Sequence, residues 1–169
     1  MPHAPSPTPD LHIRFARISE REGLEALQLR ASLVWREYRA ALLAHPEAIA
    51  IPVEQIRERR VRIAERSGRV VGFAVVIPLR EGEAELDALF VEPGCMHAGT
   101  GRALVVDVAR LARRRGARSL FVMANPYAKA FYAKVGFVAV GRAETAFGPA
   151  VRMRMALANT PAAHVICIS

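Results

Sequence analysis

Two glycines, Gly99 and Gly101, stand directly ahead of an apolar run with helical spacing. The first N–H groups of a helix have no intrahelical partner and lie at the positive end of the helix dipole. Glycine leaves such amides open to close approach, because no side chain covers them. A phosphate placed there gains several charge-assisted hydrogen bonds. The segment 96–102 is therefore a candidate phosphate-binding loop, and Arg102 could add a positive charge.

The same glycines also suit a tight turn without any ligand, and their spacing alone does not separate the two interpretations. Two other phosphate motifs are excluded. No Lys-Ser or Lys-Thr follows the second glycine, so the segment is not a P-loop. The third glycine of a dinucleotide fingerprint is missing, and the segment lies mid-chain rather than after the first strand.

Charge and composition narrow the classes of partner. The chain has 169 residues and a net charge of +8, which attracts polyanions such as nucleic acid, acidic lipid or a phosphorylated cofactor. Its hydrophobic content of 52% excludes wholesale disorder. No apolar run is long enough to span a membrane, and the proline-rich N-terminus lacks the apolar core of a secretory signal.

Cysteine and histidine spacing argues against a metal site. Cys95 and Cys167 have neither metal nor redox spacing, and the five histidines are scattered. We therefore expect no metal and a cytoplasmic protein with two thiols.

The apolar periodicity predicts the elements that hold these residues. Ser19 and Glu22 have the spacing of a capping box, and Asn125-Pro126 has the pattern of a helix start. In chain order, we expect a strand at 11–18, one or two helices in 19–44, a short helix from 53, three strands within 60–94, a helix from Gly99 to Gly116, a strand at 118–124, a helix from Asn125 to Gly136, and strands at 137–143 and 150–157.

This order predicts an α/β (α+β) fold. A strand–helix–strand unit around 86–124 requires a parallel pair joined by a right-handed crossover. The short turns elsewhere require antiparallel pairs. A mixed, mostly antiparallel sheet with helices on both faces satisfies both requirements.

Two motifs together resemble the GCN5-related N-acetyltransferase (GNAT) superfamily. The family's cofactor motif, Arg/Gln-x-x-Gly-x-Gly/Ala, is matched by residues 96–101, although Met96 stands where Arg or Gln is usual. A second signature, Asn-(x)₆-Tyr followed by Gly-Phe, is matched by Asn125, Tyr132, Gly136 and Phe137. The resemblance covers roughly residues 11–157 in element order.

The resemblance implies a sheet of about six or seven strands in which a splayed parallel pair holds acetyl-CoA. The pantetheine would pair with backbone groups of Leu89, Phe90 and Val91, and Asn125 would contact the cofactor arm. Lys129 and Lys134 are candidates for the ribose phosphate. The pyrophosphate would lie on the amides of Met96, His97, Ala98, Gly99, Thr100, Gly101 and Arg102.

The resemblance also suggests an acid for the reaction. Tyr132 would lie near the sulfur of acetyl-CoA, and a phenol stays protonated at neutral pH, as the donor of a proton to a leaving thiolate must. Taken alone, Tyr132 would be interpreted as a core tyrosine, because it lies on an apolar helix stripe.

The base is less sharply indicated. Glu85 and Asp87 lie two residues apart and would share one face of the strand before the glycine loop, where either could accept the amine's proton. A solvated strand face explains the pair equally well. Trp35, Tyr38 and Leu42 have helical spacing in the region where the family forms its acceptor pocket, and we interpret them as core packing.

These observations predict an N-acetyltransferase domain at 11–157 between a disordered tail at 1–10 and a second tail at 158–169. It would transfer the acetyl group of acetyl-CoA to a primary amine by direct attack in a ternary complex. The alternative is a non-catalytic acyl-CoA-binding sensor on the same fold. We expect no nucleic-acid partner, because most aromatics occupy core-like positions, and no membrane partner. Dimers are frequent in this family, so the resemblance allows a homodimer.

Overall fold

A computed structural model describes residues 10–158 of the chain. The two tails expected at 1–10 and 158–169 lie outside the described residues, apart from Asp10 and Ala158. One sheet of seven strands has the order β1-β2-β3-β4-β5-β7-β6. Its strands are β1 (Leu11–Phe15), β2 (Val61–Arg66), β3 (Arg69–Pro78), β4 (Glu83–Val91), β5 (Ser119–Ala124), β6 (Val138–Thr145) and β7 (Gly148–Ala156).

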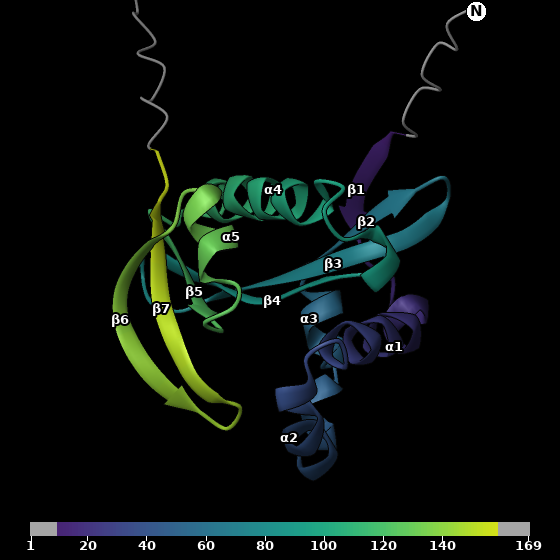
Figure 1. The fold of residues 1–169 in the computed structure, drawn as a ribbon. Helices are drawn as coiled ribbons and strands as arrows, with labels where there is room; N and C mark the ends of the chain where they lie inside the picture. The colour runs from purple at the N-terminus through teal and green to yellow at the C-terminus, as the bar shows by residue number, and fades with distance from the viewer. Residues whose placement is uncertain (1–9, 159–169) are drawn as a thin grey trace, which may run out of the picture.

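The helices cover both faces of this sheet, as Figure 1 shows. On one face lie α4 (Thr100–Arg114) and α5 (Lys129–Lys134), and on the other lie α1 (Arg21–Ser32), α2 (Arg39–Ala44) and α3 (Val53–Arg57). Short 3-10 turns join them: η1 (Ile18–Glu20), η2 (Arg36–Tyr38), η3 (Pro46–Ile49) and η4 (Pro93–Cys95). No helix in the described part is long and apolar enough to cross a membrane.

The pairing confirms the predicted mixed topology. Strands β4 and β5 are parallel, joined through α4, and every other neighbouring pair is antiparallel. The three strands expected within 60–94 are β2, β3 and β4, and their two connecting turns place glycines at positive φ, Gly68 at 72° and Gly82 at 75°. Alternating apolar residues of these strands reach both faces, so each face receives its own apolar layer.

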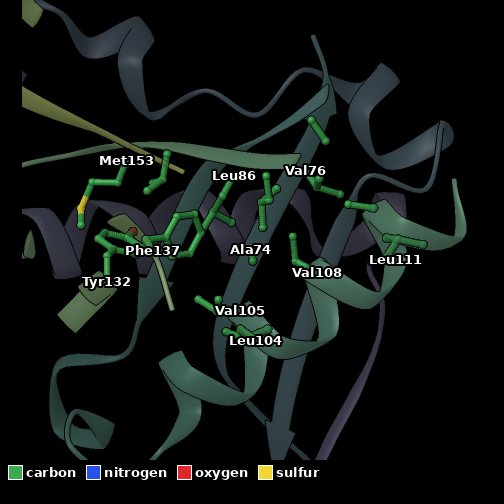
Figure 2. Packing of buried hydrophobic residues seen from close by; sticks show 14 of the residues in the cluster. Ala74, Val76, Leu86, Leu104, Val105, Val108, Leu111, Tyr132, Phe137 and Met153 are labelled. Atoms are coloured by element: carbon green, nitrogen blue, oxygen red, sulfur yellow. The ribbon is translucent and has the colours of Figure 1, made fainter. Parts of the chain in front are cut away.

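Two buried clusters hold the helices to the sheet. The larger lies between the sheet and α4 and α5, where Leu104, Val105 and Val108 pack on Ala74, Val76 and Leu86 (Figure 2). The smaller lies beneath the opposite face, where Leu24 and Leu27 of α1 and Ile56 of α3 pack against Ile63 and Phe73. Leu104, Val108, Leu111 and Ala112 form one apolar stripe of α4, and all four are buried.

Two predicted helix starts are wrong by a few residues. The capping interaction involves Arg17 and Glu20 rather than Ser19 and Glu22: the Arg17 amide donates to the Glu20 carboxylate at 2.8 Å, ahead of η1. Glu20 is better placed because it also accepts two hydrogen bonds from Arg14 on β1. Helix α5 begins at Lys129, because Asn125 caps the turn before it instead: the Asn125 side-chain oxygen accepts from the Ala128 amide at 2.8 Å.

Candidate active site

The parallel strands β4 and β5 separate partway along their length. They pair from Glu83 opposite Ser119 to Leu86 opposite Val122, and β4 then continues to Val91 without this neighbour. The separation begins at a β-bulge, because Val76 faces Leu86 while Val75 faces Ala88, which leaves Asp87 as the extra residue. This is the splayed parallel pair that the family resemblance implied.

The far half of β4 therefore presents a free backbone edge. The Glu92 amide donates to the Val71 carbonyl at 2.8 Å, so the polar groups of Phe90, two residues earlier, also point toward β3. The alternation along a strand directs those of Leu89 and Val91 to the opposite edge, into the gap. Of the three residues predicted to bind pantetheine, Leu89 and Val91 offer backbone groups there, whereas Phe90 does not.

The loop after β4 continues this free edge with unpaired amides. The Cys95 amide donates to the Glu92 carbonyl. The next amide along the chain that has an acceptor is that of Ala103, which donates to the Gly99 carbonyl. Within the described chain, none of the amides of residues 96–102 finds a backbone or side-chain acceptor. They surround the N-terminus of α4, a helix of 15 residues whose cap makes no side-chain hydrogen bond. A row of unsatisfied donors at a helix start is suited to a pyrophosphate.

The two glycines of this loop have different structural roles. Gly99 adopts φ +81°, a left-handed conformation that L-residues rarely adopt, and a Cβ there would meet nothing within 4 Å. Gly101 has an ordinary backbone, but its missing side chain makes room for Phe131 of α5. Gly99 therefore supplies a backbone conformation, and Gly101 supplies space for the Phe131 ring.

Thr100 and His97 complete the shape of the loop. The Thr100 side chain is 1% exposed, its hydroxyl has no partner within residues 10–158, and its methyl packs close to Gly72 of β3. The side chain of Thr100 therefore packs into the protein and does not reach a ligand. His97 has φ +63° and is exposed. This departure from the usual backbone geometry turns the loop before α4 begins.

The second predicted motif lies beside the first. Asn125 follows β5 directly, at the end where β5 has separated from β4. Its side-chain oxygen accepts a hydrogen bond from the Ala128 amide, so its side-chain nitrogen remains able to donate to another partner. Lys129 and Lys134, at the two ends of α5, are exposed.

Tyr132 is buried within the larger cluster. It is 8% exposed and packs edge-on against Phe137, with ring centroids 5.5 Å apart (Figure 2). Phe131 also packs edge-on against Tyr132, with ring centroids 5.1 Å apart. Burial raises the pKa of its phenol above the ordinary value. The group therefore stays protonated at neutral pH, as a proton donor must.

Glu85 and Asp87 lie on the opposite face of the sheet from Tyr132. Their neighbours Ala84 and Leu86 belong to the cluster under α4, which directs the two carboxylates toward the α1–α3 side. Burial, and then the charge of Asp87, raises the pKa of Glu85. Burial also raises the pKa of Asp87, although the Gln55 side chain of α3 partly offsets this. The gap between β4 and β5 thus separates the candidate acid from the candidate bases.

Three residues that the sequence analysis did not single out, Phe121, Met123 and Arg152, share the α1–α3 side of the sheet with Glu85. We call the residues Glu85, Phe121, Met123 and Arg152 the open face. Met123 is 37% exposed, and the Arg152 guanidinium lies over the Phe121 ring at 4.0 Å. Arg152 precedes the buried Met153 on β7, so strand alternation could have indicated its face, but not its position over Phe121.

Aromatic side chains from separate segments lie around the open face. Trp35 stacks on Tyr127 with centroids 5.1 Å apart, and Tyr38 lies edge-on to Phe147 of the β6–β7 hairpin at 6.4 Å. Trp35 and Tyr38 are partly exposed and belong to neither buried cluster, so their interpretation as core packing is wrong. Leu42 is buried as expected. The helical spacing misled because Trp35 precedes a 3-10 turn rather than lying within a continuous helix.

A separate depression of about 360 Å³ lies between β1 and α4. It includes Gly99 and Arg102, but otherwise Ile13 and residues of the outer side of α4 line it. It is therefore on the β1 side of α4, away from β5 and the gap. Within the described residues, no group of three His, Cys, Asp or Glu side chains is arranged to hold a metal ion.

The fold and the glycine loop define a protein of the acetyltransferase class, and comparison with known sequences agrees. Residues 28–137 match the profile of the Acetyltransferase (GNAT) family. The chain belongs to this family.

Individual relatives are more distant. An uncharacterized N-acetyltransferase of Mycobacterium tuberculosis is 34% identical over 82 residues, which is 47% of this chain and 53% of the relative. The chain thus spans about half the length of the curated relatives it matches.

Solved structures agree in fold. The PaiA N-acetyltransferase of Thermoplasma acidophilum, in complex with coenzyme A, aligns with a TM-score of 0.70 at 19% identity, covering 87% of this chain and 99% of that one. Ard1 of Thermoplasma volcanium aligns with a TM-score of 0.69 at 19% identity, covering 88% and 99%.

Proposed function

We propose that residues 11–157 form an N-acetyltransferase domain that transfers the acetyl group of acetyl-CoA to a primary amine. The observation that carries this proposal is the row of unpaired amides at 96–102, which continues the free edge of β4. Together they offer donors for a pyrophosphate and, at Leu89 and Val91, partners for an extended amide-bearing arm. The coenzyme A bound to the PaiA protein supports the same choice of ligand.

Acetyl-CoA supplies an acetyl group on a thiol leaving group, and the residues around the gap are suited to its transfer. The acceptor nitrogen forms a bond to the carbonyl carbon while the carbon–sulfur bond breaks. Backbone N–H groups of Leu89 or Val91 stabilise the negative charge that develops on the carbonyl oxygen, an effect worth about 3 kcal/mol where it has been measured.

Two protons move in this reaction. Glu85 or Asp87 receives the proton that the amine loses, directly or through water. Tyr132 donates a proton to the departing sulfur and recovers one from solvent. The raised pKa of Tyr132 favours its protonated form, and the raised pKa of Glu85 makes it a stronger base once ionised.

The alternative is a non-catalytic sensor that binds acyl-CoA on the same fold. Both functions require the amide row, so binding alone does not separate them. Calorimetry with acetyl-CoA tests the shared requirement, and thiol release from acetyl-CoA in the presence of a panel of amines tests catalysis. Absence of binding at millimolar acetyl-CoA would contradict both functions, whereas binding without thiol release for any amine would favour the sensor.

A further inference from the structure

Arg152 of β7 is a cation on the open face without a counter-ion. None of the ion pairs formed within residues 10–158 involves it. Its contact is with an aromatic ring, since its guanidinium lies over Phe121 at 4.0 Å. The side chain is only partly buried, so a ligand can reach it. A guanidinium held flat in this way keeps its edge donors for a carboxylate.

Arg152 also lies close to the candidate base. Glu85 and Phe121 are direct neighbours in the parallel ladder of β4 and β5, and adjacent strands lie about 4.8 Å apart. The guanidinium over Phe121 lies on the same side of the sheet as Glu85, close enough for its charge to offset part of the rise in the Glu85 pKa. The guanidinium of Arg152 can bind a carboxylate, and the carboxylate of Glu85 can bind an ammonium group. Together they match a molecule that carries an ammonium and a carboxylate on neighbouring atoms.

Aromatic side chains from separate segments meet on the α1–α3 side of the sheet. Phe147 at the β6–β7 turn lies 6.4 Å from both Tyr38 and His45, which joins that hairpin to the segment around α2. Trp35 and Tyr127 make a similar contact between the α1–α2 region and the β5–α5 turn. These contacts offer apolar walls to an acceptor.

We propose that the acceptor is a small amino acid-like molecule, with its amino group beside Glu85 and its carboxylate on Arg152. This inference rests on the proposed acetyl transfer and specifies the acceptor of that reaction. Arg152 would be a specificity residue, because it contacts the acceptor away from the reacting nitrogen.

Matched pairs of acceptors test the role of the carboxylate. L-Phenylalanine and 2-phenylethylamine, or L-leucine and 3-methylbutylamine, differ only in this group, and thiol release from acetyl-CoA reports turnover for each. We expect the wild-type protein to prefer the amino acid of each pair by about 10- to 100-fold in kcat/KM, as a charge-assisted bidentate contact provides.

Variants of Arg152 test whether this residue causes the preference. Arg152→Gln should raise KM for the amino acid with little change in kcat, should leave 2-phenylethylamine unaffected, and should thereby abolish the preference. Arg152→Lys should restore part of it. Arg154→Gln is the matched control, because Arg154 lies two residues along the same strand but donates to Ser119 at 2.9 Å. It should keep the preference. Circular dichroism and melting temperature verify that each variant folds.

Each other result overturns the inference. Equal or better acetylation of the amine that lacks a carboxylate contradicts it, as does an Arg152→Gln variant that slows both members of a pair alike. Binding of acetyl-CoA with turnover only of polyamines or peptides excludes the amino acid class and leaves the proposed acetyl transfer intact. Failure to bind acetyl-CoA removes the proposed function and this inference with it.

Discussion

Phe131 of α5 lies directly over the backbone of Gly101 near the start of α4. A Cβ on Gly101 would come within 3.3 Å of the Phe131 ring, and Val91 of β4 would be its next neighbour at 3.7 Å. This one position thus joins the glycine loop, the helix that carries Tyr132 and the end of β4. The two sequence motifs, separate along the chain, meet at this contact.

Gly101→Ala should disturb both motifs. The added methyl group pushes Phe131 outward, and we expect it to lower stability by about 1 kcal/mol, as mild overpacking does. Acetyl-CoA affinity should fall several-fold because α5 shifts. Thermal melting and calorimetry measure the two effects. Gly94→Ala is the control, since a Cβ there meets nothing within 4 Å and its φ is not positive. Unchanged affinity in Gly101→Ala would show that the contact does not shape the site.

Gly99→Ala should act through the backbone alone. A Cβ at Gly99 has free space, but φ +81° costs an L-residue about 1 kcal/mol. The loop would relax and scatter the amides at 96–102, so we expect weaker acetyl-CoA binding by about tenfold. Asn tolerates this conformation, and Gly99→Asn should therefore retain more affinity than Gly99→Ala. Calorimetry on the two variants gives the comparison, and equal affinities would contradict it.

Tyr132→Phe separates catalysis from binding. The ring packs against Phe131 and Phe137 in either form, so we expect the fold and the acetyl-CoA affinity to persist. Loss of the proton donor should lower kcat by about 100-fold, a typical contribution of general acid catalysis. Tyr127→Phe is the control, because it removes only the hydroxyl of an exposed tyrosine and keeps the ring that stacks on Trp35. Unchanged turnover in Tyr132→Phe would assign the proton to another donor.

Glu85→Gln should stabilise the fold while reducing activity. A carboxyl whose pKa is raised by folding favours the folded state at low pH, and that contribution is lost as pH rises through the raised pKa. The neutral amide avoids this loss, so the variant should melt higher than the wild type at pH 8 and equally at pH 4.

Activity gives the second readout for Glu85. If it accepts the amine's proton, kcat falls in Glu85→Gln at every pH. Asp87→Asn is the comparison, because burial also raises the pKa of Asp87. The variant with the larger loss of kcat identifies the base. A wild type that melts higher than Glu85→Gln at pH 8 would contradict the raised pKa.

Much of the fold was predictable because it depends on local pattern. The strands β2, β3 and β4 follow from β-like apolar runs between turns, and α4 follows from an apolar stripe that ends before Gly116. The parallel pairing of β4 and β5 then follows from the length of the connection between them. Cap positions were less accurate, because long-range partners such as Arg14 selected Glu20 over nearer alternatives.

The sequence alone determined the family, the order of the elements and the loop at 96–102, because each of these is encoded by residues close together in the chain. Only the tertiary structure decided that the backbone groups of Phe90 point toward β3. It also decided that Tyr132 and Glu85 lie on opposite faces of the sheet and that Arg152 lies over the Phe121 ring. These facts depend on a bulge at Asp87 and on strand neighbours distant in sequence. The side-chain period of a strand is two residues, so one extra residue reverses every later assignment of side chains to a face.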